Sequence, residues 1–171
     1  MAPTYELIAS NTLTTSAASV TFSSIPATYT DLVLRVSVRN ANAATTGTLR
    51  IELNGDTAAN YSFTALNGDG SVAASSRSDN RNDISAGLVN AGTSTSNTFS
   101  SIEFYFPNYT STVNKPVSVF TAQENNTTAA DIRVIAGLYR NSTAINQIVA
   151  NSQGANFVSG SSFWLYGIKN S

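Results

Sequence analysis

Carboxylates are the only side chains of this chain suited to acid–base catalysis at neutral pH. The 171 residues include no histidine and no cysteine, which removes the usual general base, the commonest metal ligand and the thiolate nucleophile. A glycosidase can operate with two carboxyls alone, roughly 5–10 Å apart. Glu52, Glu103 and Glu124 are the candidates, on or just after strand-like segments. Because the chain has only four glutamates, we predict solvated strand residues and a protein that is not an enzyme.

The acidic residues between positions 67 and 83 match a calcium-binding loop only in part. Asn67-Gly68-Asp69-Gly70 is followed by Asp79 and Asp83, but the alternating oxygen ligands and the closing glutamate at fixed spacing are missing. We therefore predict a hairpin turn here, with neither a metal nor a cofactor.

Charged side chains of the same segment could instead contact a partner. Arg77 and Arg81 are interleaved with acidic residues, a pattern that suits a docking loop on a neighbouring subunit or shell protein. A solvated, mobile loop is the alternative, and the sequence does not decide between them. Arg35 and Arg39 are expected to be ordinary solubilising charges.

Aromatic side chains could stack on sugars. Tyr61, Tyr109 and Trp164 are the candidates for such a platform. Burial in the core is the commoner fate of aromatic residues and is favoured here.

Low charge excludes two classes of partner. Nine basic and ten acidic residues give a net charge of −1, without the basic stripe of a nucleic-acid binder or the basic amphipathic helix of a membrane-surface binder. No apolar stretch approaches the roughly 20 residues of a membrane helix. The first residues do not resemble a signal peptide, so synthesis in a cytoplasm is expected.

Apolar and polar residues alternate with period two in about ten segments, as in half-buried strands. The predicted strands are residues 20–25, 31–39, 48–54, 61–66, 84–88, 99–106, 117–123, 132–139, 145–150 and 162–168. Asn-Gly turns and prolines separate them. The pattern predicts an all-β, single-domain antiparallel β-sandwich, jelly-roll-like, with a closed barrel as the competing topology.

The domain organisation is predicted to be simple. Residues 1–8 are expected to form an extended N-terminal arm, and residues 9–171 the β-sandwich domain. Residues 70–83 lack periodicity and are predicted to be a long exposed loop.

Two predicted strands, at residues 104–106 and 163–168, are apolar on both faces. Such strands need cover on both sides, from the same chain or from a neighbouring subunit, and an interface is slightly favoured. The candidate oligomer or shell contacts are Tyr5, Arg77, Arg81, Tyr105, Trp164 and Tyr166.

An ordered set of short motifs resembles small β-rich virion proteins of tailed bacteriophages, many of them from phages of aquatic bacteria such as cyanobacteria. The motifs are YELI (5–8), ASVTFSSIP (18–26), YTDL (29–32), LRI (49–51), NGD (54–56), NYS (60–62), PNYT (107–110), AGLY (136–139), FVSGS (157–161) and LYGI (165–168). The resemblance spans most of the chain. It implies a component of the virion, made in the bacterial host cytoplasm, and carries over no catalytic residues.

The expected function is therefore structural. We expect a capsid decoration or cement protein that binds the outer shell as a homo-oligomer, with a trimer favoured by the habit of similar proteins. Its partners would be further copies of itself and the major capsid protein or other virion proteins. The alternative is a carbohydrate-binding module of a tail fibre or baseplate that recognises host surface glycans.

Overall fold

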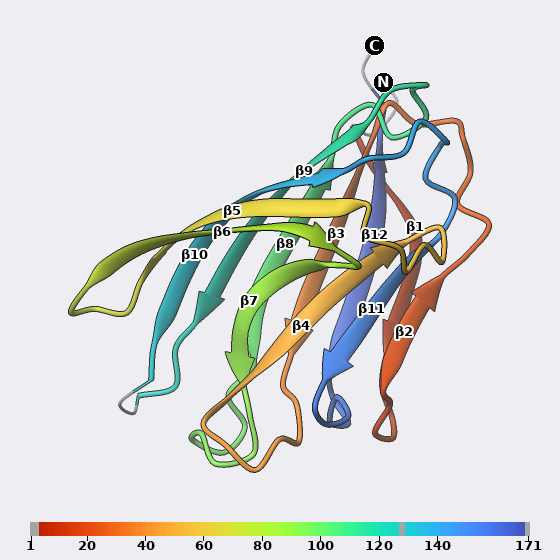
Figure 1. Cartoon of the computed structure of the whole chain (residues 1–171). Coiled ribbons are helices and arrows are strands. Elements are labelled where there is room, and N and C mark those ends of the chain that lie inside the picture. The colour runs from red at the N-terminus through yellow and green to blue at the C-terminus, as the bar shows by residue number, and fades with distance from the viewer. Residues whose placement is uncertain (1–3, 127–128, 170–171) are drawn as a thin grey trace.

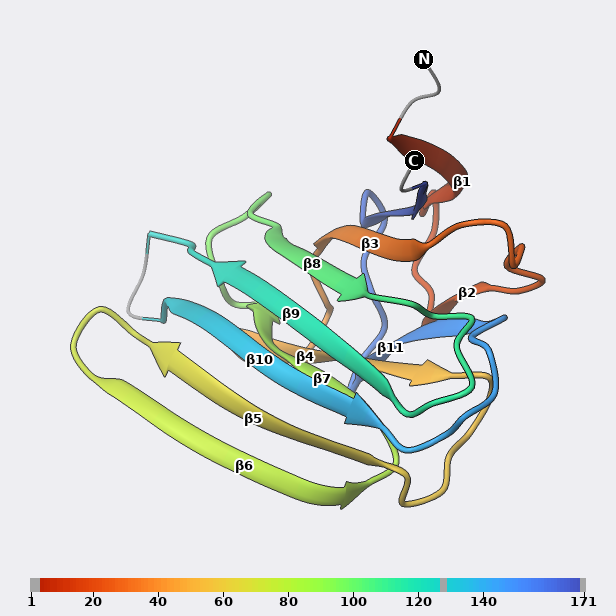
Figure 2. The ribbon, with the colours of Figure 1, turned by 90° about the horizontal axis from the view of Figure 1, so that it is seen from above.

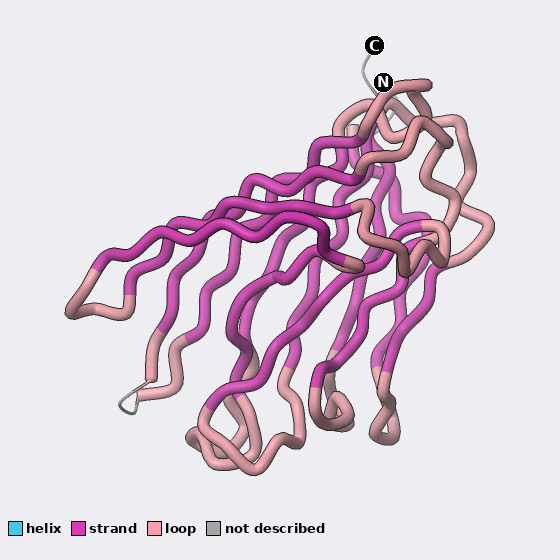
Figure 3. The backbone as a smooth tube through the Cα atoms, viewed as in Figure 1, coloured by secondary structure: helices cyan, strands magenta, loops and turns pink. Residues whose placement is uncertain are grey.

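Residues 4–126 and 129–169 are described by the computed structural model, and this part of the chain consists of strands and loops only (Figure 3). The strands are β1 (Tyr5–Thr12), β2 (Ser19–Phe22), β3 (Asp31–Val38), β4 (Thr46–Leu53), β5 (Tyr61–Gly68), β6 (Ala73–Arg81), β7 (Ile84–Asn90), β8 (Ser100–Phe106), β9 (Lys115–Gln123), β10 (Asp131–Tyr139), β11 (Ile148–Gln153) and β12 (Ser162–Ile168). Ten of them coincide with the strands predicted from alternation, within a few residues at each end.

The strands form two antiparallel sheets (Figure 1). The large sheet has the order β1-β12-β3-β8-β9-β10-β5-β6, and the small sheet β2-β11-β4-β7. Seen from above, the small sheet lies against one face of the large one (Figure 2). The predicted all-β sandwich is confirmed. Both sheets have two edge strands, so neither closes into a barrel; the jelly-roll-like topology stays a prediction.

The core lies between the sheets and is built by alternation. In β3, Leu32, Leu34 and Val36 point toward the small sheet, while in β4 the alternate residues Leu49 and Ile51 point back at them; all are buried. Such a core supplies most of the stability, because each fully buried aliphatic side chain contributes about 1.5–3 kcal/mol.

The predicted loop at residues 70–83 is wrong, because most of it is β6. This strand pairs with β5 through Leu66↔Ser75 and Thr64↔Arg77, and it forms an edge of the large sheet. Its side chains are exposed on both faces apart from two that are partly buried. A strand that buries neither face has no reason to alternate, so period two could not reveal it.

The first strand begins inside the segment expected to be an arm. Residues 5–8 form the first half of β1, which pairs with β12 from Tyr5↔Ile168 to Thr12↔Ser162. The expected boundary between residues 8 and 9 therefore falls within a strand. Residues 1–3 lie outside the described part of the chain.

Arg39 is not the solvated charge that the sequence suggested. It is buried, and its guanidinium donates hydrogen bonds to the carbonyl oxygens of Gly92, Ser94, Thr95 and Thr98 in the β7–β8 loop, at 2.8–3.4 Å. Within the described chain it forms no ion pair, so backbone carbonyl dipoles and the hydroxyls of Ser94 and Thr98 compensate its charge. Arg39 therefore holds this loop against the sheet.

Candidate binding face

One face of the large sheet, here called the outer face, carries most of the exposed large apolar side chains of the described residues. The small sheet covers the opposite face, so side chains that alternate away from it point to solvent. Among the described residues eight large apolar side chains are exposed. Six of them lie on the outer face: Tyr5, Leu7, Leu66, Phe120, Ile132 and Val134. Exposed apolar residues gathered on one face are typical of an interaction surface.

The register of the sheet places large and small side chains in separate rows across the outer face. One row of consecutive cross-strand partners, from β12 to β5, is Trp164, Arg35, Glu103, Phe120, Val134 and Leu66. The adjoining row, from β12 to β9, is Ser162, Ser37, Ser101 and Ala122. Because the second row is built of small residues only, the face is hollowed along it.

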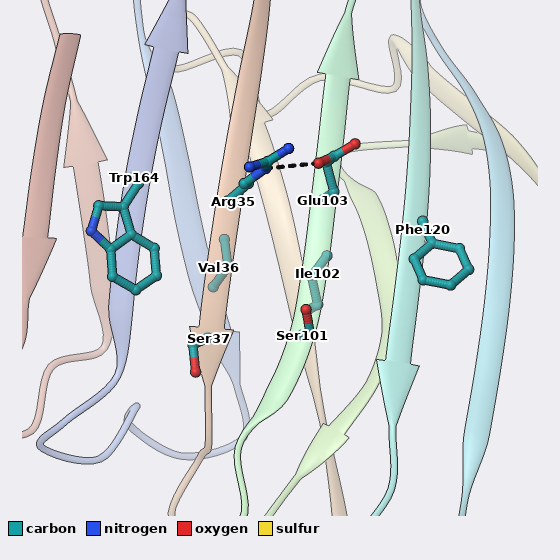
Figure 4. Close-up of a pocket in the computed structure, with 8 residues that line it drawn as sticks. All are labelled: Arg35, Val36, Ser37, Ser101, Ile102, Glu103, Phe120 and Trp164. Carbon is teal, nitrogen blue, oxygen red and sulfur yellow. Dashed lines mark hydrogen bonds and ion pairs between the residues drawn. The ribbon is translucent and has the colours of Figure 1, made fainter. Parts of the chain in front are cut away.

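The resulting groove lies between Trp164 on β12 and Phe120 on β9 (Figure 4). Its volume is about 390 Å³. Arg35 and Glu103 form an ion pair along one side, with 2.9 Å between Nε and Oε2. Ser37 and Ser101 line it below this pair. Strand centres are spaced about 4.8 Å apart, so the two aromatic walls, three strands apart, are separated by roughly 14 Å.

An aromatic cluster surrounds Arg35 on the β1 side of the groove. The guanidinium carbon lies 5.7 Å from the ring centre of Tyr5 and 5.9 Å from that of Tyr166, which are cation–π distances. The two rings meet edge to face at 6.3 Å. On β8, Tyr105 donates a hydrogen bond to the carboxylate of Asp31 at 2.9 Å. The pKa of Tyr105 is raised, mainly by burial.

Four of the six contact residues predicted from the sequence come together here: Tyr5, Tyr105, Trp164 and Tyr166. Arg77 lies on the same face but on β6, at the far edge of the sheet, where it is exposed. Arg81 does not belong to this group. It forms an ion pair with buried Asp83 at 3.2 Å, and Asp83 also binds Arg50 at 2.9 Å, so Arg81 joins β6 to β4.

An apolar patch that sequence analysis missed covers β5 and β10 on the outer face. Leu66, Ile132 and Val134 are 55–60% exposed there. Together with Ala73 they line an apolar depression of about 240 Å³. A signal was available in the sequence, because residues 134–139 are apolar on both faces, as are residues 104–106 and 163–168. This β5–β10 patch continues the outer face beyond Phe120.

The candidate catalytic carboxylates are not brought together. Glu103 lies on the outer face of the large sheet, and Glu52 lies on β4 of the small sheet. Burial raises the pKa of Glu52, and a hydrogen bond with Asn151 acts in the opposite direction and lowers it in part. Glu124 accepts hydrogen bonds from the backbone N–H groups of Asn125 and Asn126. No pair of these glutamates faces a shared cleft in the described chain.

Two of the three candidate sugar platforms are buried. Tyr61 and Tyr109 are fully buried, as the favoured interpretation predicted. Tyr61 stacks on Tyr139 at 4.7 Å between ring centres. Only Trp164 reaches the surface.

The acidic side chains of Asp69, Asp79 and Asp83 do not gather at one point. Asp69 accepts N–H bonds from Ser71 and Val72 in the turn between β5 and β6, and these bonds lower its pKa. Nowhere in residues 4–126 and 129–169 do three or more acidic side chains gather so that they could hold a metal ion.

Comparisons with known proteins add no family. The sequence matches no protein-family model and no curated protein. The described part of the chain contains no helix that could span a membrane.

Proposed function

We propose that this chain is a non-enzymatic structural protein of a bacteriophage particle, a decoration or cement protein that coats the outer shell as a homo-oligomer. The observation that carries the proposal is the β5–β10 patch. Leu66, Ile132 and Val134 present aliphatic surface to solvent on a regular, rigid sheet. The ordered motifs that resemble those of small virion proteins of tailed phages support a place in a phage particle, and the candidate catalytic carboxylates are not brought together.

Mass action makes a modest contact sufficient. A protein that binds only the assembled shell stabilises it by RT ln(1 + [L]/Kd) at every site. More than half the surface of Ile132 and of Val134 is exposed to solvent and could be buried on docking. Complete burial of an aliphatic side chain contributes about 1.5–3 kcal/mol. Many copies multiply this contribution over the particle. The oligomer is proposed to be a trimer, which sedimentation equilibrium tests directly.

Copy number in purified particles tests the proposal. Quantitative mass spectrometry should find the chain at near-stoichiometric abundance relative to the major shell protein. A few copies per particle would place it at the tail and refute shell coating.

The patch itself is tested by Ile132→Thr with Val134→Thr, which keeps β-branched residues in the strand. Binding to shells assembled without this chain should weaken at least about tenfold, which corresponds to 1.4 kcal/mol. The matched control is Val113→Thr, because Val113 is 62% exposed but lies in a loop away from the sheet face. Equal binding of all variants would exclude the patch as the docking surface.

A further inference from the structure

The groove between Trp164 and Phe120 is a second feature of the outer face, beside the aliphatic β5–β10 patch. Its length of roughly 14 Å, estimated from strand spacing, suits an extended ligand. Its volume of about 390 Å³ lies within the range of small-molecule sites. The groove exists because Ser37 and Ser101 stand where large residues occupy the neighbouring row. It is therefore a fixed property of the sheet register.

The chemistry of the groove is amphipathic. Trp164 and Phe120 offer ring faces at its two ends, while Ser37 and Ser101 offer hydroxyls between them. Sugar rings combine apolar C–H faces with hydroxyls around their edges, and so match this alternation of aromatic and hydroxyl groups. An aliphatic peptide segment would leave the serine hydroxyls unmatched.

The ion pair has spare hydrogen-bonding groups that face solvent. Arg35 uses its Nε on Glu103, while neither its two Nη groups nor the Glu103 Oε1 bonds to another group of the described chain. A guanidinium donor beside a carboxylate acceptor can bind two adjacent hydroxyls of a sugar at once.

Arg35 is also held in place before any ligand arrives. The rings of Tyr5 and Tyr166 lie 5.7 and 5.9 Å from its guanidinium carbon. A side chain fixed in this way loses little conformational entropy on binding. The opposite charges of Arg35 and Glu103 cancel, so the lining has no net charge. A neutral ligand fits it better than an anionic one.

We propose that this groove binds a neutral oligosaccharide, with sugar rings stacked on Trp164 and Phe120 and hydroxyls bound by Arg35, Glu103 and the two serines. The site does not depend on shell docking through the β5–β10 patch. It adjoins that patch on the outer face, because Phe120 and Val134 are cross-strand partners, so sugar binding is measured on the free protein.

The single tryptophan of the chain makes binding directly observable. Trp164 fluorescence is titrated with five neutral hexasaccharides: β-1,4-linked glucose, N-acetylglucosamine, mannose and xylose, and α-1,4-linked glucose. At least one should give a saturable change with Kd of about 1 mM or tighter, the range of weak specific binding. No saturable change with any of the five overturns the proposal. Hexagalacturonate tests the charge assignment, and binding as tight as that of the best neutral sugar would overturn it.

Two serine variants locate the site. Ser101→Leu fills the floor of the groove and should reduce sugar affinity at least tenfold. Ser118→Leu is the matched control, because Ser118 is an exposed outer-face residue of β9 that does not line the groove. Equal sugar affinity in the two variants overturns the proposal.

Shell binding separates this inference from the proposed function. Ser101→Leu should bind shells normally, while the Ile132/Val134 variant should bind sugar normally. If Ser101→Leu weakens shell binding and leaves sugar binding unchanged, the groove belongs to the protein-docking surface and the saccharide assignment fails.

Discussion

Replacement of Arg39 by methionine should destabilise the protein through the β7–β8 loop. The guanidinium donates to four carbonyl oxygens and to the hydroxyls of Ser94 and Thr98. Methionine fills similar volume but donates nothing. The carbonyls of exposed Gly92 and Thr95 can bind water instead. Ser94 is only 5% exposed, so its carbonyl would be left without a hydrogen-bond partner.

The magnitude follows from two opposing effects. A hydrogen bond to a charged group contributes about 1.5–3 kcal/mol, and a buried acceptor left unpaired costs about 1–3 kcal/mol. Removal of a buried charge that has no ion-pair partner also removes the cost of desolvating it, and this offsets part of the loss in stability. We expect a net loss of about 2–4 kcal/mol in the free energy of unfolding. Arg39→Lys keeps the charge with three donors in place of five and should lose roughly half as much.

Urea unfolding followed by Trp164 fluorescence measures this loss, and hydrogen exchange of residues 91–98 shows whether the loop opens locally. The control is Arg35→Met in β3, because the ion pair of Arg35 is about half exposed and should contribute less than about 1 kcal/mol. If Arg39→Met unfolds within about 0.5 kcal/mol of the wild-type protein, with unchanged exchange in the loop, the clamp assigned to Arg39 is refuted.

Three further outcomes are expected. Lys115→Met should lose about 1–3 kcal/mol in the free energy of unfolding in urea, because the buried ammonium donates to three backbone carbonyls that would lose their partner. Burial also lowers the pKa of this ammonium. An unchanged unfolding midpoint would contradict the prediction. Gly167→Ala should lose about 1–3 kcal/mol, because an added Cβ would lie 2.3 Å from the ring of Tyr29. Gly68→Ala is the comparison and should lose less, because an added Cβ would meet its nearest atom, in Ile132, at an ordinary contact distance of 3.6 Å. Burial and then the charge of Asp56 raise the pKa of Tyr139 to about 12 from 10.0. The folded state therefore favours the neutral phenol, and this contribution to stability is complete below pH 10 and lost as pH rises toward 12. Tyr139→Phe should show a shallower alkaline loss than the wild-type protein, and an identical slope would disprove the assignment.

The strands that sequence analysis identified share one physical property, a face buried between the sheets. Leu49, Ile51 and Leu53 alternate with polar residues because β4 buries one side only, and the same cause produced the other correct predictions. β6 escaped because it buries neither side. Alternation with period two therefore reveals a strand that buries one face. It does not reveal a strand that is only hydrogen-bonded to its neighbour.

Contacts between distant segments explain what else was missed. Alternation placed Arg39 on a solvent-facing side, but a loop more than 50 residues later folds over it. The groove likewise needs β3 to pair with β8 before Ser37 and Ser101 become neighbours, and it needs β12 and β9 beside them before Trp164 and Phe120 flank it. By contrast, Trp164 and Tyr166 could be identified as contact candidates, since apolar residues on both faces of one strand are visible locally. The same criterion applied to Ile132 and Val134 would have identified the β5–β10 patch.

The free edge of β6 bears on how the protein behaves when crowded. An open strand edge is a template on which a second chain can add, and such addition leads to aggregation. Here the edge carries Arg77, Asp79 and Arg81, and its register shifts opposite Tyr61 and Phe63, with Asn80 at a φ of 51°. A bulge of this kind twists the strand end away from a straight partner. Copies held side by side would therefore not pair through their β6 edges into a continuous sheet. Each copy would keep its own fold at high local concentration.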